Sequence, residues 1–272
     1  MPRVSVLLPT FNGSRTIGKA VGSVLAQTVR DLELIVIDDA SDDDTVRECV
    51  LAAQGDSRLR VVTNPRNLHI CGSLNRGIAE SSGEFIARID DDDEWCDRQK
   101  LQNQLHLLST DPSLGLVGTW AILVDVDGRP CGLGRPCTSD AAIRRALLRG
   151  NQFIHSSVVF RRAAVGSGYD PAMVTVEDYD LWLRIGTAWR LGNIPETCVR
   201  YRINPNGISR QQWYRQKWRA LKISWRYRSQ FPFTMSAMAY RLLEFPIPPS
   251  LAAWMSRQKA ILRTVASDSA PE

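Results

Sequence analysis

The chain has 272 residues, of which 44% are apolar and 23% charged, so it can bury one sizeable core and has the composition of an ordinary globular protein. Its net charge of +5 is uneven, because the segment from Gly207 to the end holds eleven Lys and Arg against three Asp and Glu, which leaves the first 206 residues net acidic. The six cysteines form no Cys-x-x-Cys pair, and no apolar run is long and clean enough to span a bilayer, which argues against a zinc site, a disulfide framework and a transmembrane protein.

Short β-rich runs alternate with helical patterns through the first half of the chain. The runs predict strands over residues 4–8, 32–37, 59–62 and 84–89, and helices over 14–27, 43–53 and 71–80. This alternation predicts βαβ units and an α/β fold that is Rossmann-like, with a mostly parallel central sheet and helices on both faces. The carboxyl ends of the strands then share one edge, where open α/β sheets bind ligands.

The second half mixes both kinds of element. Strands are predicted over residues 116–124, 156–160 and 197–203, and helices over 141–149 and 178–189. No Gly-, Ser- or Pro-rich linker separates the two halves, so residues 1–206 are interpreted as one domain. Residues 207–272 form a basic, helical C-terminal extension.

An acidic cluster, Asp90 to Glu94, follows the predicted strand 84–89 directly. Five adjacent carboxylates repel one another unless a cation holds them, and oxygen ligands of this kind suit Mg²⁺ or Mn²⁺. The alternative is a solvated acidic loop, as most charge runs are. The position at a strand end favours the metal site.

Asp38 and Asp39 end the predicted strand 32–37, on the same expected edge. A carboxylate there can accept hydrogen bonds from a base N–H or from ribose hydroxyls. The alternative is that the stretch caps the next helix through Ser41 or Asp42. Two acidic strand ends on one edge favour the ligand site.

Phe11 follows the first strand, where it either stacks on a nucleobase or belongs to the core, and for a lone aromatic the core is favoured. Glu177, Asp178 and Asp180 open a predicted helix. A helix start favours one acid through capping and the macrodipole, but three acids exceed that need, so one can serve as a general base. His155 either lines the cleft or is a hydrogen-bonded structural histidine.

The basic tail contains Tyr214, Trp218, Leu221 and Trp225 at the spacing of one helical stripe. Residues 207–230 carry seven Lys and Arg and no acid. Either the aromatic stripe packs on the catalytic domain with the basic face in water, or the helix lies on an anionic membrane surface, with residues 207–255 forming the contact. No nucleic acid partner is expected, because nothing in the body of the chain supports one.

Taken together, these residues resemble the family 2 nucleotide-sugar glycosyltransferases, which are inverting enzymes of the GT-A fold. The resemblance extends over about residues 2–209, in family order and spacing. The segments that carry it are residues 4–12, 34–42, 75–78, 83–88, 90–93, 98, 104, 155–162 and 177–182.

The resemblance implies roles for particular residues. It implies a nucleotide-binding set made of Pro9, Phe11, Asp39, Asp90 and Asp91. Asp92 corresponds to the ligand of a Mn²⁺ or Mg²⁺ ion, and Asp178 to the catalytic base. Ala40 and His69 stand where the family commonly has glycine, Cys96 where a proline often follows, and Asn204 where a histidine is frequent.

The expected function is therefore inverting transfer of a sugar from a nucleotide-diphosphate donor, with a UDP-sugar favoured, to an acceptor hydroxyl of a lipid-linked or cell-surface glycan precursor. The alternative is an inactive nucleotide-sugar-binding partner protein. Prenyl diphosphate enzymes and haloacid-dehalogenase-like phosphatases fit poorly, because a β-run precedes the acids and Glu94 stands where the phosphatases need Thr or Val. With no secretory signal after Met1, a cytoplasmic location is expected, with peripheral contact to the inner face of the membrane.

Overall fold

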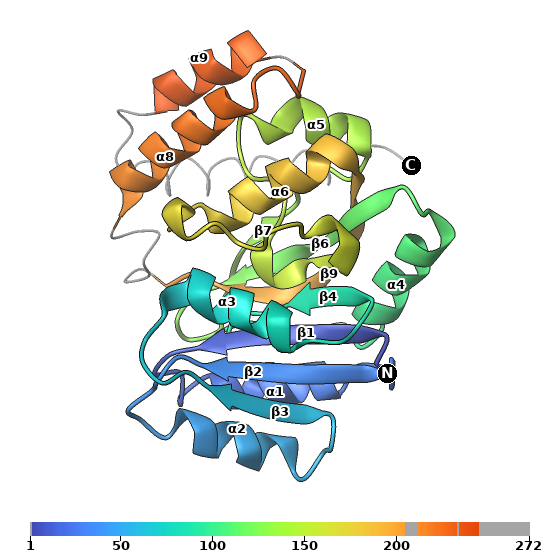
Figure 1. The fold of residues 1–272 in the computed structure, drawn as a ribbon, viewed down its shortest axis with the longest axis vertical. Helices are drawn as coiled ribbons and strands as arrows, with labels where there is room; N and C mark the ends of the chain where they lie inside the picture. The colour runs from blue at the N-terminus through green and yellow to red at the C-terminus, as the bar shows by residue number, and fades with distance from the viewer. Residues whose placement is uncertain (1, 205–211, 233, 245–272) are drawn as a thin grey trace.

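The computed structural model describes residues 2–204, 212–232 and 234–244, which build one nine-stranded sheet covered by helices (Figure 1). The strands are β1 (Val4–Thr10), β2 (Leu32–Asp38), β3 (Leu59–Thr63), β4 (Phe85–Arg88), β5 (Glu94–Trp95), β6 (Leu114–Val124), β7 (Pro130–Gly134), β8 (Val159–Arg161) and β9 (Arg190–Arg202). The α-helices are α1 (Ile17–Leu25), α2 (Thr45–Ala53), α3 (His69–Glu80), α4 (Lys100–Thr110), α5 (Asp140–Leu147), α6 (Glu177–Ala188), α8 (Trp213–Arg226) and α9 (Thr234–Glu244). Short 3₁₀ helices are η1 (His155–Ser157), η2 (Arg162–Ala164) and η3 (Pro171–Met173).

The strands lie in the order β3-β2-β1-β4-β8-β6-β9-β5, with β7 paired to β6. β1 is parallel to β2 and β4, β2 to β3, and β6 to β9. β8 is antiparallel to both β4 and β6, so these two run in the same direction, while β5 and β7 oppose their partners. Six strands of the described sheet thus run one way and share an edge at their carboxyl ends, as the mostly parallel α/β prediction requires.

Helices cover both faces of the sheet (Figure 1). One core cluster packs α3, α5 and α6 against side chains such as Leu7 and Ile35. The other packs α1, α2 and α4 against the alternate positions, such as Val6 and Leu34. Because successive side chains of a strand point to opposite faces, burial on both faces accounts for the continuous apolar runs of β1 and β2.

The C-terminal extension is helical, as predicted, in its described part. Ala220 and Ile223 of α8 and Ala237 of α9 belong to the same core cluster as α5 and α6. The proposed boundary at 206/207 and the segment 245–272 lie outside the described residues, so the division into residues 1–206 and 207–272 stays a prediction. Among the helices that the structure describes, none is long and apolar enough to cross a membrane.

Helix α4 was not predicted, because two polar residues interrupt its apolar face. Lys100 and Gln104 are fully buried beside Leu101, Leu105 and Leu108. The Lys100 ammonium donates to Gln104 Oε1 at 2.8 Å and lies 3.9 Å from the ring centre of Trp95. Burial lowers the pKa of Lys100 to about 7. Tertiary partners, rather than the local pattern, therefore make this helix face compatible with the core.

The predicted strand 156–160 is shorter in the structure. Ser156 and Ser157 lie in η1, where the Ser157 N–H donates to the carbonyl of Ile154 at 2.9 Å, and the ladder starts only at Val159. Serine hydroxyls that bond to nearby backbone compete with strand pairing. Conversely, β9 begins at Arg190 rather than at residue 197, because it pairs with β6 over most of its length.

Two departures from the family pattern coincide with left-handed backbone. Ala40 has φ 64° and His69, at the start of α3, has φ 60°. Glycine adopts this region without a steric penalty, whereas a side chain costs roughly 1–2 kcal/mol. The glycines common at these two positions in the family thus have a backbone reason.

Candidate active site

The strand ends that carry the predicted site residues meet at one edge of the sheet. The backbone N–H of Asp39 donates to the carbonyl of Thr10 at 2.8 Å. The Thr10 hydroxyl in turn donates to Asp91 Oδ2 at 2.5 Å. The ends of β1, β2 and β4 are thereby linked, and the predicted nucleotide-binding residues lie on a continuous surface.

Phe11 is 50% exposed at this edge, which corrects the expectation that it belongs to the core. Pro9, the other residue expected at the base, is buried within β1 opposite Ile37. The physical reason is that β1 ends at Thr10, so Phe11 extends beyond the sheet, where no helix covers it. An exposed ring beside polar strand ends is available for stacking on a flat base.

Asp39 is buried, and among the described residues only one of its two carboxylate oxygens accepts hydrogen bonds. Its Oδ1 accepts from Asn64 Nδ2 at 2.6 Å and from the backbone N–H of Leu68 at 2.7 Å. Oδ2 accepts no hydrogen bond from the described residues, which leaves it for a donor on a ligand. The alternative, in which Ser41 or Asp42 caps the next helix, is wrong. Helix α2 begins at Thr45, and the carboxylate oxygen that accepts from the Thr45 N–H, at 3.0 Å, is Oδ1 of Asp43.

Asp90, whose side chain is 30% exposed, forms an ion pair with the buried Arg88, the last residue of β4. The guanidinium donates to Asp90 Oδ2 and Oδ1 at 2.6 Å each, and the Ser156 hydroxyl donates to Oδ2 at 3.1 Å. Burial by itself raises the pKa of Asp90, but the Arg88 charge and hydrogen bonds hold it below the usual value. Asp90 is thus ionised, and both of its oxygens already accept hydrogen bonds.

The pKa values of the next three carboxylates are raised rather than lowered. Burial, together with the Asp90 charge, raises the pKa of Asp91 to about 6, and burial with the charges of Asp90 and Asp91 raises the pKa of Asp92 to about 7. Burial also raises the pKa of Asp93 well above its usual value, and Asp93 Oδ2 is buried without a partner. Crowded, poorly compensated carboxylate oxygens are the donor set of a hard divalent cation, so these residues fit Mg²⁺ or Mn²⁺.

Basic side chains face the acidic loop across a cavity of about 140 Å³. Arg202 at the end of β9 donates its backbone N–H to Asp93 Oδ1 at 2.7 Å and its Nε to the Asp92 carbonyl at 3.1 Å. Lys19 and Arg200 line the same cavity. Cations next to acids at a strand edge suit a ligand that carries phosphates and a metal ion.

Glu177 and Asp178 open α6 without capping it. Asp178 Oδ2 accepts from Asn151 Nδ2 at 2.7 Å, and its Oδ1 accepts from the N–H of Tyr179 at 2.6 Å. Burial and the charge of Asp178 raise the pKa of Glu177 to about 7, and burial also raises the pKa of Asp178. A carboxylate with a raised pKa suits a general base near neutral pH.

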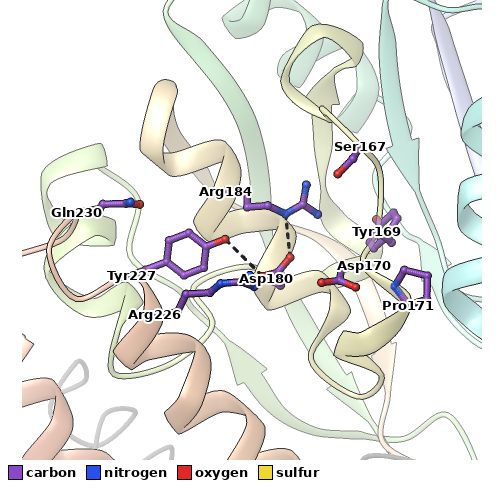
Figure 2. A pocket seen from close by; sticks show the side chains of 9 residues that line it. All are labelled: Ser167, Tyr169, Asp170, Pro171, Asp180, Arg184, Arg226, Tyr227 and Gln230. Carbon is purple, nitrogen blue, oxygen red and sulfur yellow. Dashed lines mark hydrogen bonds and ion pairs between the residues drawn. The ribbon is translucent and has the colours of Figure 1, made fainter.

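Asp180, the third acid of the motif, has a structural role. It is buried, and its Oδ2 accepts from Arg184 Nε at 2.8 Å while Oδ1 lies 3.5 Å from the Tyr227 hydroxyl (Figure 2). These groups line a separate cavity of about 530 Å³ between α6 and α8. Of the three acids, Asp178 and Glu177 are therefore the ones available for a catalytic role.

The carboxylates of α6 and of the acidic loop act on one another electrostatically. The positive charge of Arg88 lowers the pKa of Asp178 against the effect of burial, and Asp90 raises it. Burial and the charges of Asp93, Asp90, Asp92 and Asp178 together raise the pKa of Tyr201. The expected base and the expected metal ligands are thus close enough for the charge of one to shift the pKa of the other.

His155 is a structural residue. Its Nε2 lies 3.2 Å from the Tyr169 hydroxyl, and its ring packs edge-on against Trp182 with centroids 5.8 Å apart. Burial and the nearby Arg88 charge lower its pKa well below the usual value, so the ring is neutral. The structural interpretation of His155 is the one that these contacts support.

A sequence model of glycosyl transferase family 2 matches residues 5–134. WfgD of Escherichia coli, a UDP-Glc:alpha-D-GlcNAc-diphosphoundecaprenol beta-1,3-glucosyltransferase, is 30% identical over 244 residues, which cover 89% of this chain and 91% of WfgD. The chain belongs to glycosyltransferase family 2.

Solved structures are similar in fold to this family 2 glycosyltransferase. S. aureus TarS 1-349 in complex with UDP-GlcNAc has a TM-score of 0.69 at 17% identity, covering 92% of this chain and 74% of TarS. The mannosyltransferase PcManGT from Pyrobaculum calidifontis, in complex with GDP-Man and Mn²⁺, has a TM-score of 0.64 at 18% identity, covering all of this chain and 76% of PcManGT. The predicted GT-A fold is confirmed.

Four residues of this glycosyltransferase had no role assigned from the sequence: Arg88, Asn64, Asn151 and Arg202. Each orients a predicted site carboxylate, as described above. An arginine inside the apolar run of β4 was a detectable signal, because a buried cation needs a partner. The two asparagines are remote in sequence from Asp39 and Asp178, and only the fold identifies their partners.

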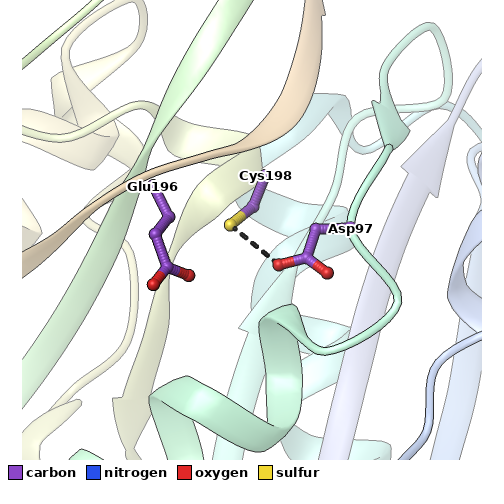
Figure 3. A group of neighbouring side chains, drawn as sticks. All are labelled: Asp97, Glu196 and Cys198. Carbon is purple, nitrogen blue, oxygen red and sulfur yellow. Dashed lines mark hydrogen bonds between the residues drawn. The ribbon is translucent and has the colours of Figure 1, made fainter.

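A second group of side chains that could bind a metal ion lies outside the predicted site of this family 2 glycosyltransferase. Asp97, Glu196 and Cys198 bring their ligand atoms within 4.8 Å of one another, the one such group of three found in the part of the chain that the structure describes (Figure 3). The Cys198 thiol donates to Asp97 Oδ2 at 3.4 Å, and burial raises its pKa to about 12. The protonated thiol makes this a structural contact. The acidic loop itself gathers no three ligand atoms so closely, as suits an ion completed by substrate phosphates.

Proposed function

We propose that this glycosyltransferase is an inverting, metal-dependent enzyme that transfers a hexose from a UDP-sugar to a hydroxyl of a lipid-linked glycan precursor. The observation that carries the proposal is the half-buried Glu177–Asp178 pair at the start of α6, which lies close enough to the acidic loop for the Asp90 charge to raise the pKa of both acids. The nucleotide-sugars in the TarS and PcManGT complexes support the donor class, and the reaction named for WfgD supports the acceptor.

The nucleotide lies at the carboxyl edge of β1, β2 and β4 in this proposal. Phe11 stacks on the base beside Pro9, and Asp39 Oδ2 accepts a base N–H. Asp90 and Asp91 lie at the ribose and diphosphate, and Arg202 lies across the loop from them. Asp92 would hold Mn²⁺ or Mg²⁺, as a divalent ion would neutralise charge on the departing diphosphate when bound; the Mn²⁺ in the PcManGT complex supports this choice.

Asp178 acts on the acceptor. Its carboxylate takes the proton of the acceptor hydroxyl while that oxygen bonds to the anomeric carbon from the face opposite the diphosphate. The bond from the anomeric carbon to the diphosphate oxygen breaks, and the nucleoside diphosphate leaves with that electron pair. Displacement in line inverts the anomeric centre. Asn151 keeps the carboxylate aimed and ionised through its hydrogen bond.

The proposal is tested by incubating the protein with UDP-, GDP- and dTDP-sugars plus Mn²⁺ or Mg²⁺ and measuring release of nucleoside diphosphate. We expect slow hydrolysis of one donor that EDTA abolishes and that Asp92→Ala lowers at least about 10²-fold, since electrostatic stabilisation is usually the largest catalytic contribution. Asp31→Ala, an exposed position just before the amino end of β2, is the matched control and should behave as wild type.

Each other outcome has a definite meaning. Hydrolysis that persists in EDTA contradicts the metal requirement. Metal-dependent nucleotide binding without release, even when a lipid-linked acceptor is supplied, identifies an inactive binding protein. No binding of any nucleotide overturns the proposal.

The pH dependence of transfer tests the base. Because the pKa of Asp178 is raised, and it must be ionised to accept a proton, activity should fall as pH decreases through a value above that of an ordinary carboxyl. Asn151→Leu removes a hydrogen bond that lowers this pKa, so the acid limb of kcat/KM should move to higher pH. Asn103→Leu, at a half-buried position of α4 whose amide donates to Glu196, should leave the profile unchanged. An unshifted limb in Asn151→Leu contradicts this role.

A further inference from the structure

The aromatic stripe of α8 faces outward. Tyr214, Trp218 and Trp225 are 52%, 49% and 55% exposed. The opposite side of the helix, with Ala220 and Ile223, is buried in the core. One of the two interpretations of the tail is that the stripe packs on the catalytic domain. The exposed Tyr214, Trp218 and Trp225 contradict it, whereas Leu221 of the same stripe is partly buried against the core cluster.

Exposed apolar side chains gather on the C-terminal helices. Of thirteen large hydrophobic residues that the described structure exposes, seven lie in α8 and α9, which pack together at one end of the molecule (Figure 1). They are Tyr214, Trp218, Trp225, Met235, Tyr240, Leu242 and Leu243. The other six are scattered over the rest of the chain. A gathering of this kind marks an interaction surface, whereas isolated exposed residues do not.

The same surface is strongly basic. The described residues from Trp213 to Glu244 include seven Lys and Arg and one acid, Glu244 at the end of α9. On α8 these cations flank the aromatic stripe on both sides, given the helical period: Lys217 and Arg228 on one, Lys222 and Arg226 on the other. Lys222 lies 5.2 Å from the ring centre of Trp218, and Arg228 4.6 Å from that of Trp225.

We propose that α8 and α9 form a membrane-docking surface that lies in the interface of a bilayer containing anionic phospholipid. Tryptophan and tyrosine favour the headgroup level, leucine and methionine reach the acyl boundary, and flanking Lys and Arg pair with lipid phosphates. A protein partner fits less well, because interface cores are depleted in lysine. The surface deepens the proposed function, on which it rests for the membrane location of the acceptor.

The surface is coupled to the catalytic helix. The Ser224 hydroxyl, on the buried side of α8, lies 3.0 Å from the hydroxyl of Tyr179. Tyr179 follows Asp178 directly, so the helix that rests on lipid packs against the first turn of α6. Docking through the stripe therefore keeps the proposed base next to the membrane surface from which a lipid-linked acceptor extends.

The test is flotation of the full chain with vesicles of phosphatidylcholine alone or of phosphatidylcholine and phosphatidylglycerol in equal parts. Wild type should float with the anionic vesicles at low salt and much less with neutral ones. Trp218→Ser/Trp225→Ser should lower the vesicle partition coefficient at least about tenfold, and Lys222→Glu/Arg226→Glu should remove the preference for anionic lipid. Val50→Ser/Leu51→Ser, on exposed positions of α2, is the matched control and should bind as wild type.

Circular dichroism and donor hydrolysis in the absence of vesicles accompany each variant. The stripe variants should keep wild-type ellipticity and wild-type hydrolysis, which separates loss of docking from loss of fold or function. If wild type does not bind anionic vesicles, or if a stripe variant floats as well as wild type, the proposed docking surface is wrong. Vesicle binding without any donor turnover leaves the docking surface standing and counts against the proposed function alone.

Discussion

Asp178→Asn is expected to lower the rate of sugar transfer by roughly 10²- to 10⁴-fold, the usual contribution of a positioned general base. The amide has nearly the shape of the carboxylate and can keep a hydrogen bond from the Tyr179 N–H, so the start of α6 should remain in place. What it loses is the capacity to accept a proton from the acceptor. The affinity for the nucleoside diphosphate, measured by calorimetry, should therefore stay within about threefold of wild type.

Glu177→Gln is the comparison that separates the two acids. Glu177 shares the half-buried position and the raised pKa of Asp178, but among the residues that the structure describes no side chain hydrogen-bonds its carboxylate as Asn151 does that of Asp178. Removing its charge leaves Asp178 and its hydrogen bond from Asn151 in place, so transfer should persist. A large loss in Glu177→Gln, with activity retained in Asp178→Asn, would assign the base to Glu177 instead.

Arg88→Leu is expected to lower the free energy of unfolding by about 3 kcal/mol, the lower end of the cost of breaking a buried ion pair, because the partly exposed Asp90 carboxylate loses its partner. Arg88 is fully buried and donates to both oxygens of Asp90. Urea denaturation followed by circular dichroism measures the change. Arg47→Leu, which removes an exposed pair to Asp44 at 3.9 Å, should change the free energy by no more than about 1 kcal/mol.

The double variant Arg88→Leu/Asp90→Asn tests the cause. With the negative charge removed together with the positive one, part of the lost stability should return, since the largest penalty in the single variant is an unpaired buried charge. A double variant less stable than Arg88→Leu would mean that Arg88 stabilises the fold through packing and not through Asp90.

The sequence by itself determined the architecture of the first half and the sheet edge at which the proposed site residues lie. The runs 4–8 and 32–37 are apolar on both faces, which is a local property, and the alternation with helices requires parallel strands. From parallel strands it follows that Asp39 and Asp90–Asp92 share an edge, before any contact is known. The acids at the start of α6 were likewise identifiable from their number in one helical turn.

The tertiary structure determined which side chains and helix faces pack against one another. Helix α4 escaped prediction because Lys100 and Gln104 are buried by partners that are distant in sequence. Phe11 was expected in the core, yet it lies beyond the end of β1. The stripe of α8 has a helical period whether it is buried or exposed, and only the packing of Ala220 and Ile223 on the core turns it outward. Periodicity shows that a helix has two faces, while the side that is buried depends on long-range contacts that no local pattern contains.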